Sequence, residues 1–139
     1  MGIPRDADAR LYYRCAIQRF DDARALLAAD RTTGAVYLAG YGIECILKAL
    51  ILEGLAPSRR SEVRERFRGA WAHDYERLRS IYYLEVKGPR FPIEVTEAFT
   101  LAREWSSELR YAPRTWTYPD ASAFMAAAGV IIGWADGRM

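Results

Sequence analysis

His73 is the one histidine of the sequence, and its type is the one best suited to acid–base chemistry. An unperturbed imidazole titrates near neutrality, so His73 can act as a general base on a ribose 2′-hydroxyl. Arg68 lies five residues before it, and either Arg68 or Arg110 would stabilise the charge that grows on the phosphate. The alternative is structural: His73 or Asp74 would cap the helix that is predicted to begin there.

Glu44 and Lys48 are four residues apart with the acid first, the order in which a helical ion pair is most favourable. They interrupt an apolar run, and charges on an apolar helix are costly unless they are paired. One interpretation is structural, with the pair bonding to neighbouring helix ends or to a dimer partner. The other is functional, with Lys48 on a phosphate and Glu44 as its orienting partner.

A basic and aromatic group lies nearer the end of the chain. Arg110 and Tyr111 end a predicted helix, where a basic side chain is favoured by the helix dipole and can bond free carbonyls. The competing interpretation places Arg110, Tyr111 and Arg114 around an anionic ligand. In that arrangement Tyr111 or Trp116 would stack on a base.

Two further groups are predicted to be structural. Three tryptophans are expected in the core, namely Trp71, Trp105 and Trp134. The arginine-rich segment 57–72 is either a short helix or a mobile arm, and Glu62 and Glu65 partly neutralise it. This composition favours a solvated face, and the alternative is an arm that contacts an RNA backbone.

Helices have to position these residues, because the hydrophobic period is helical nearly everywhere. The predicted helices cover about 7–29, 34–54, 74–84, 93–109 and 119–134. The second of them is apolar on most sides, which is typical of a central helix, and Thr32 or Thr33 is expected to cap it. Its Gly40 and Gly42 indicate close approach of a neighbouring helix or a ligand. We therefore predict an all-α protein, an antiparallel up-down bundle of four to five helices forming one domain over residues 1–139.

Composition excludes several classes of protein. The 20 basic and 18 acidic residues give a net charge of +2, too even for nucleic-acid binding through bulk charge alone. Cys15 and Cys45 lie within apolar helical patterns, which favours buried thiols in a reducing cytoplasm over a disulfide framework. These two cysteines and His73 cannot form a four-ligand zinc site without carboxylates. The apolar stretch from Ile43 to Leu55 is interrupted by charges and is too short to span a bilayer. We expect a cytoplasmic, prokaryotic protein with no cofactor, no metal and no membrane span.

The run Ala35-Val-Tyr-Leu-Ala-Gly-Tyr-Gly-Ile-Glu-Cys-Ile-Leu-Lys-Ala-Leu-Ile-Leu52 resembles the second-helix signature of HEPN domains, the higher eukaryotes and prokaryotes nucleotide-binding domains. That signature is a glycine-containing apolar helix with a Glu-x-x-x-Lys pair. The run His73-Asp74-Tyr75 with Leu78 is similar to the start of the next helix of the family. A tryptophan before an Arg-Tyr pair is matched by Trp105 and Arg110-Tyr111. The resemblance extends from about residue 9 to about residue 134.

The resemblance implies a small all-α bundle that forms a homodimer and binds nucleotide or RNA. Many members are encoded beside a minimal nucleotidyltransferase, with which they form toxin–antitoxin modules. Many others are metal-independent endoribonucleases whose signature is an arginine, four to six residues and then a histidine. In this chain that spacing occurs between Arg68 and His73, in an earlier segment than in the family and with Gly69 in the usually polar position.

We therefore expect a HEPN-type homodimer that acts with a nucleotidyltransferase encoded nearby. In such a module the protein would be either the toxin-like component or a nucleotide-binding accessory subunit. If it is catalytic, the expected reaction is metal-independent RNA cleavage. The alternative from another class is a non-catalytic helical interaction module, in which the buried charges only fix the packing.

Overall fold

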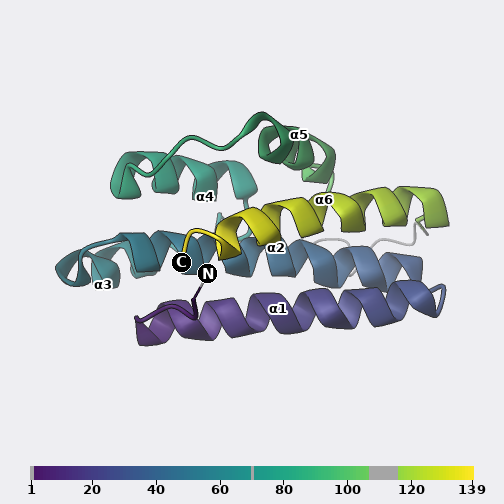
Figure 1. The fold of residues 1–139 in the computed structure, drawn as a ribbon, viewed down its shortest axis with the longest axis horizontal. Coiled ribbons are helices and arrows are strands. Elements are labelled where there is room, and N and C mark those ends of the chain that lie inside the picture. Colours follow the sequence, from purple (N-terminus) through teal and green to yellow (C-terminus); the bar gives the residue numbers. More distant parts are fainter. Residues whose placement is uncertain (1, 70, 107–115) are drawn as a thin grey trace.

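Six α-helices and one π-helical segment make up the part of the chain that the computed structural model describes, residues 2–69, 71–106 and 116–139 (Figure 1). The elements are α1 (Ala7–Ala28), α2 (Thr32–Gly54), α3 (Pro57–Glu65), α4 (Tyr75–Ile81), η1 (Tyr82–Val86), α5 (Ile93–Ala102) and α6 (Tyr118–Asp136). Within these residues there is no strand. The prediction of an all-α helical bundle is confirmed.

The three long helices α1, α2 and α6 lie side by side, and α4, η1 and α5 cover one side of them (Figure 1). A tight turn joins α1 to α2, so these two helices are antiparallel. The backbone N–H of Gly2 donates to the carbonyl oxygen of Met139 over 3.2 Å. This bond places the start of α1 beside the end of α6, so α1 is antiparallel to α6 as well.

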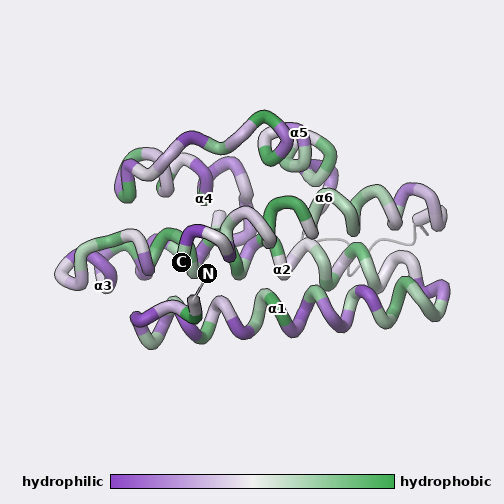
Figure 2. The backbone as a smooth tube through the Cα atoms, in the orientation of Figure 1, coloured by the Kyte–Doolittle hydropathy of each residue, from purple (hydrophilic) through white to green (hydrophobic). Residues whose placement is uncertain are grey.

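The central position of α2 explains why this helix is apolar on most sides. It contacts α1, α3, α4, η1 and α6, and most of its residues from Ala35 to Leu52 are buried. By length and composition alone α2 would be long and apolar enough to cross a membrane, but most of it is buried inside the bundle. By contrast, hydrophilic and hydrophobic residues alternate along α1, which has one side exposed (Figure 2). The prediction of a central second helix is therefore confirmed.

The predicted threonine cap of α2 is wrong. Arg31 occupies the N-cap position and makes no capping hydrogen bond through its side chain. The hydroxyl of Thr32 instead donates to the carbonyl oxygen of Trp116 over 2.6 Å. The hydroxyl of Thr33 accepts from the backbone N–H of Trp116 over 3.1 Å. Both threonines thus hold the chain where it enters α6, a contact between residues more than 80 positions apart that local sequence patterns do not encode.

The predicted helix over 74–84 is divided into α4 and the wider turn of η1. The backbone N–H of Lys87 donates to the carbonyl oxygen of Tyr82 over 3.2 Å, and Lys87 ends the segment with a φ of 56°. The Tyr82 ring stacks on Phe91 with centroids 5.2 Å apart, and its hydroxyl donates to the carbonyl oxygen of Pro89. The π-helical turn therefore ends where a buried tyrosine holds the following loop. The predicted helix over 93–109 is α-helical only to Ala102, and residues 107–109 lie outside the described residues.

Candidate functional site

Glu44 is the centre of the candidate site and is buried in the middle of α2. Its Oε2 accepts from the Nζ of Lys48 over 2.8 Å. Its Oε1 accepts from the Nδ1 of His73 over 2.7 Å. The structure therefore brings together, through one carboxylate, the helical acid–base pair and the histidine that the sequence singled out separately.

Lys48 is buried along with its partner, since both side chains are only 6% exposed. The ammonium group lies over the rings of Tyr12 and Phe67, with Nζ 5.7 and 5.5 Å from the two ring centroids. A cation over ring faces is attracted by their electron density, more strongly when water is excluded. The Glu44 carboxylate and the two rings thus balance the charge of Lys48. This position suits Lys48 to holding Glu44 and keeps it away from direct contact with a bound phosphate.

His73 is the exposed end of this hydrogen-bonded chain, with 40% of its side chain accessible. A carboxylate can only accept, so Nδ1 is the donor to Glu44, and in the neutral ring Nε2 is then the proton-accepting nitrogen. The Tyr41 ring packs edge-on against the imidazole, with centroids 5.7 Å apart. A carboxylate that fixes the orientation and tautomer of an imidazole is the arrangement used by histidine general bases.

A tight turn carries His73 to Glu44. The backbone N–H of Asp74 donates to the carbonyl oxygen of Trp71 over 3.2 Å, and that of Ala72 donates to Gly69 over 3.1 Å. Gly69 has a φ of 88°, in the region that L side chains rarely adopt. The Asp74 carboxylate accepts from the backbone N–H groups at positions 76 and 77, so Asp74 is the N-cap of α4. Of the two alternatives predicted for this helix start, Asp74 therefore has the capping role and His73 does not.

An aromatic group lies beside the site and depends on the absence of a side chain at Gly40. The indole N–H of Trp105 donates to the carbonyl oxygen of Tyr37 over 3.2 Å, and its ring stacks on Tyr75 with centroids 5.4 Å apart. The Tyr75 hydroxyl donates to the carbonyl oxygen of Gly40 over 2.7 Å. A Cβ added at Gly40 would overlap the indole of Trp105, which confirms the close approach predicted from this glycine.

Burial keeps the phenol of Tyr75 protonated. Burial raises the pKa of Tyr75 well above its ordinary value, and the charge of Glu44 adds to that effect. The hydroxyl therefore stays a hydrogen-bond donor to α2. The Tyr75 ring stacks on Trp105, and the Trp105 ring in turn contacts Tyr41 edge-on, with centroids 4.9 Å apart. These contacts fix the position of Tyr41 beside His73.

Arg68 is not among the hydrogen-bond or ion-pair partners of His73 in the described part of the chain. Its side chain is 75% exposed, and its Nε lies 3.7 Å from a carboxylate oxygen of Glu65. It borders a shallow groove of about 300 Å³ between α1 and the segment after α3, lined by Asp8, Leu11, Tyr12, Arg64, Phe67 and Arg68. The rings of Tyr12 and Phe67 thus line this groove, and the same two rings contact the ammonium group of Lys48.

The other arginines of segment 57–72 pair with acids on other elements. Glu85 of η1 accepts from Arg66 over 2.7 Å and from Arg59 over 2.8 Å. These two hydrogen bonds, that from Arg66 first, lower the pKa of Glu85. Arg60 and Arg64 pair with the two acids at the start of α1, Asp6 and Asp8. Over residues 57–65 the segment is a helix, and these ion pairs fasten it to α1 and η1.

Three of the predicted binding residues, Arg110, Tyr111 and Arg114, lie outside the described residues. Trp116 is buried, and its ring meets Phe124 edge-on with centroids 5.8 Å apart. Of the three tryptophans predicted in the core, Trp105 is buried, and Trp134 is partly buried and packs against the hydrophobic core. The prediction for Trp71 is wrong, because this side chain is 63% exposed. Its neighbour Ala72 takes the buried position of the turn instead.

Cys15 and Cys45 are both free thiols, and each is partly buried. Burial raises the pKa of Cys45 to about 12, and the neighbouring charge of Glu44 contributes to the rise. A thiol with so high a pKa is a poor nucleophile at neutral pH. Over residues 2–69, 71–106 and 116–139, no three His, Cys, Asp or Glu side chains gather where they could hold a metal ion.

Sequence reasoning missed the aromatic residues that surround the charged group, namely Tyr12, Tyr41 and Phe67. Tyr41 had a usable signal, because a residue three positions before Glu44 lies on the same side of the helix. Tyr12 and Phe67 had none, since their position over Lys48 depends on how α1 and the segment after α3 pack against α2.

Comparison with protein-family models gives a match to the HEPN domain over residues 9–138. Searches of curated proteins and of solved structures found no match. The matched range spans nearly the whole chain and includes Glu44, Lys48 and His73.

Proposed function

Because this chain belongs to the HEPN family, we propose that it cleaves RNA without a metal ion, with His73 as the general base. Membership of the family gives the chain a nucleotide- or RNA-related function in general terms. The observation that carries the finer proposal is the 2.7 Å hydrogen bond from the Nδ1 of the half-exposed His73 to the buried carboxylate of Glu44. It fixes the ring with Nε2 as the basic nitrogen.

In the proposed reaction, Nε2 of His73 takes the proton of a ribose 2′-hydroxyl. The 2′-oxygen attacks the adjacent phosphorus, and the bond from phosphorus to the 5′-oxygen of the next nucleotide breaks. The leaving oxygen takes a proton from the imidazolium or from water, so the products are a 2′,3′-cyclic phosphate and a 5′-hydroxyl end. Glu44 stabilises the imidazolium that forms, and Arg68 or Arg110 is proposed to balance the charge on the phosphate.

The test is RNA cleavage in the presence of a chelator, with His73→Asn compared with the unaltered protein. Loss of a general base costs about 10²- to 10⁴-fold in rate, so we expect at least a 100-fold decrease. Arg90→Gln, a change at an exposed position in the loop before α5, is the control that keeps full activity. Equal cleavage by the His73 variant would refute the assignment. Complete absence of cleavage by the unaltered protein would favour the second candidate.

That second candidate is a non-catalytic nucleotide-binding or interaction subunit. Burial of both Glu44 and Lys48 favours it, because specifying the packing of the helices is a sufficient role for a buried ion pair. In either form, we propose that the protein acts in a cytoplasmic toxin–antitoxin-type module with a nucleotidyltransferase encoded nearby. Family membership supports this part of the proposal, and co-purification with the product of the neighbouring gene tests it.

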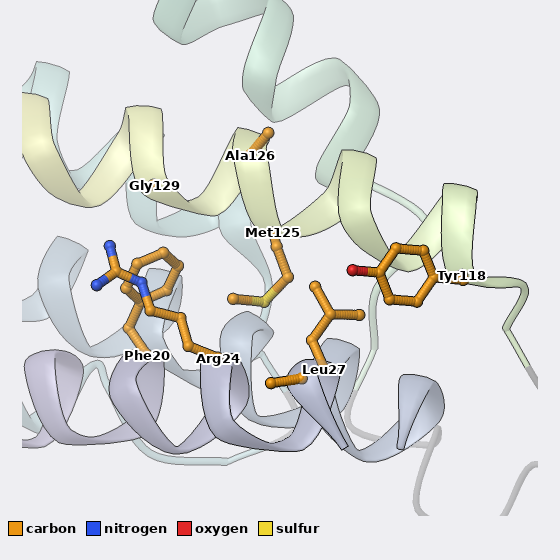
Figure 3. A pocket seen from close by; sticks show the side chains of 8 residues that line it. Phe20, Arg24, Leu27, Tyr118, Met125, Ala126 and Gly129 are labelled. Carbon is orange, nitrogen blue, oxygen red and sulfur yellow. The ribbon is translucent and has the colours of Figure 1, made fainter. Parts of the chain in front are cut away.

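We further propose that the protein is a homodimer whose partner covers the exposed side of α6. Between positions 122 and 133 the exposed residues of this side carry no charge, and they are Ser122, Ala123, Ala126, Val130 and Gly133. A groove of about 400 Å³ runs beside it between α1 and α6, and Figure 3 shows Leu27, Met125 and Phe20 along it. A face of small uncharged residues lets a second helix approach closely.

Sedimentation analysis of Ala126→Arg tests this dimer. A long charged side chain in the middle of the face would be buried without a partner, so we expect a monomer where the unaltered protein is a dimer. Gln18→Arg, on the exposed side of α1, is the matched control that stays dimeric. A dimer that tolerates Ala126→Arg uses another surface.

A further inference from the structure

Trp71 is a large, exposed aromatic side chain in the same turn as the candidate general base. Single exposed apolar residues are common on protein surfaces and need no explanation by themselves. Trp71 differs in its position, because it begins the turn that carries His73. The hydrogen bond from the backbone N–H of Asp74 to the carbonyl oxygen of Trp71 closes this four-residue turn. The ends of such a turn lie within about 7 Å of each other.

Two side chains of this turn are held by the rest of the fold. Ala72 is buried, and His73 is held by Glu44. Trp71 remains 63% exposed. Three residues before it, Arg68 has a side chain that is 75% exposed. One short segment thus combines a basic nitrogen, an exposed cation and an exposed ring face.

We propose that Trp71 stacks on a base of the bound RNA next to the ribose that meets His73, so that the substrate is single-stranded. The inference rests on the proposed function for the position of the ribose. In a duplex both faces of each base are covered by neighbouring bases, whereas an unpaired base has a face free for an aromatic side chain. Stacking of this kind tolerates any base, because every base has such a face.

The cation of Arg68 supports a nucleic acid as the occupant of this surface. Arg68 is three residues from Trp71, and its exposed pair with Glu65 at 3.7 Å contributes little, so the phosphate of the stacked nucleotide can bind its guanidinium more strongly. The inference therefore predicts two separable contributions to binding. Trp71 contributes through the base, and Arg68 contributes through the backbone.

Binding of a 2′-O-methyl RNA oligonucleotide tests the stacking, since this RNA lacks the nucleophile and is not cleaved. We expect Trp71→Ala to weaken binding of the single strand by about 5- to 150-fold, the range that corresponds to loss of a base–aromatic stack. Trp71→Phe keeps an aromatic ring and is expected to retain most of the affinity. An abasic oligonucleotide is expected to bind the unaltered protein and Trp71→Ala equally, because it has no base to stack.

Each other outcome overturns the inference. Equal binding of the single strand by Trp71→Ala and the unaltered protein would exclude stacking, and so would an equal loss for the abasic oligonucleotide. A change of oligomeric state in Trp71→Ala would identify Trp71 as a contact with a second copy.

Failure of the proposed function has a different signature. If RNA is bound in a Trp71-dependent way but never cleaved, the stacking is correct and the general base is wrong. If cleavage depends on His73 and binding does not depend on Trp71, the reverse holds.

Discussion

Glu44 and Glu85 each join two basic side chains, one through each carboxylate oxygen. Glu44 accepts from Lys48 over 2.8 Å and from His73 over 2.7 Å. Glu85 accepts from Arg59 over 2.8 Å and from Arg66 over 2.7 Å. The geometry is nearly the same, but the Glu44 side chain is 6% exposed and that of Glu85 is 20% exposed and lies at the surface.

This difference in burial gives the two bridges different consequences. At the surface, water can replace a lost partner, so an ion pair there contributes little to stability. In the interior, a charge that loses its partner stays unsolvated and is strongly destabilising. The bridge through Glu85 therefore fastens one short helix, whereas the bridge through Glu44 fixes the geometry of a buried group and through it the orientation of His73.

The largest effect is expected for Glu44→Leu, which leaves the ammonium of Lys48 buried without its acid. We expect a loss of about 3–5 kcal/mol in the free energy of unfolding, measured by urea denaturation. The double variant Glu44→Leu, Lys48→Met removes both charges, so it is expected to recover most of that loss. A single variant within 1 kcal/mol of the unaltered protein would show that the buried charges are not coupled in this way.

The next effect concerns Cys45, which lies beside Glu44 and whose pKa burial raises to about 12. In the unfolded chain this thiol ionises near its ordinary pKa of about 8.5. The contribution of this thiol to the free energy of unfolding is therefore fully present below about pH 8.5. As pH rises toward 12 it decreases, by up to about 1.4 kcal/mol per pH unit. Urea denaturation between pH 9 and 11 is expected to give a shallower decline for Cys45→Ala. Identical slopes would contradict the burial of the thiol.

A smaller effect is expected for Arg60, which is intermediate between the two bridges. Its Nε donates to the carbonyl oxygen of Leu52 over 2.9 Å, near the end of α2, and its Nη1 reaches Asp6. Arg60→Ala is expected to cost about 1–2 kcal/mol by urea denaturation, since hydrogen bonds from a charged donor are stronger than neutral ones. Arg60→Lys, which cannot span both acceptors, is expected to recover only part of this cost.

The smallest effect is expected for Glu85→Gln. The contribution of Glu85 to stability is lost as pH falls, whereas that of Cys45 is lost as pH rises. Because Arg66 and Arg59 lower the pKa of Glu85, its contribution is present above the ordinary carboxyl pKa of about 4.3. That contribution is lost as pH falls through the lowered value. The melting temperature of Glu85→Gln is therefore expected to be slightly lower at pH 7 and equal to that of the unaltered protein at about pH 2. High salt is expected to reduce the difference at pH 7, and a difference that persists at low pH would have another origin.

The part of the site that lies within one helix could be predicted from the sequence, and the parts that join different elements could not. Glu44 and Lys48 are one helical turn apart, so their pairing follows from the geometry of the helix. The bond from Glu44 to His73 joins residues 29 positions apart, and it depends on a turn that brings the chain back to α2. The same limit applies to Glu85, whose arginine partners belong to the segment after α2.

The fold was predictable for a similar reason. Hydrophobic spacing located α1, α2 and α6 to within a few residues, because a long helix repeats its pattern over several turns. Short elements offer too few turns, so the division between α4 and η1 was missed. The exposure of Trp71 was missed because hydrophobicity alone predicts burial, and in a turn the small neighbour Ala72 took the buried position.

The absence of a side chain at Gly40 has a consequence for how this protein can evolve. The indole of Trp105 occupies the volume that a Cβ at position 40 would need. Substitution of either residue therefore alters what the other position accepts. We expect homologues with alanine or a larger residue at position 40 to carry a smaller residue at position 105, so that the two positions covary.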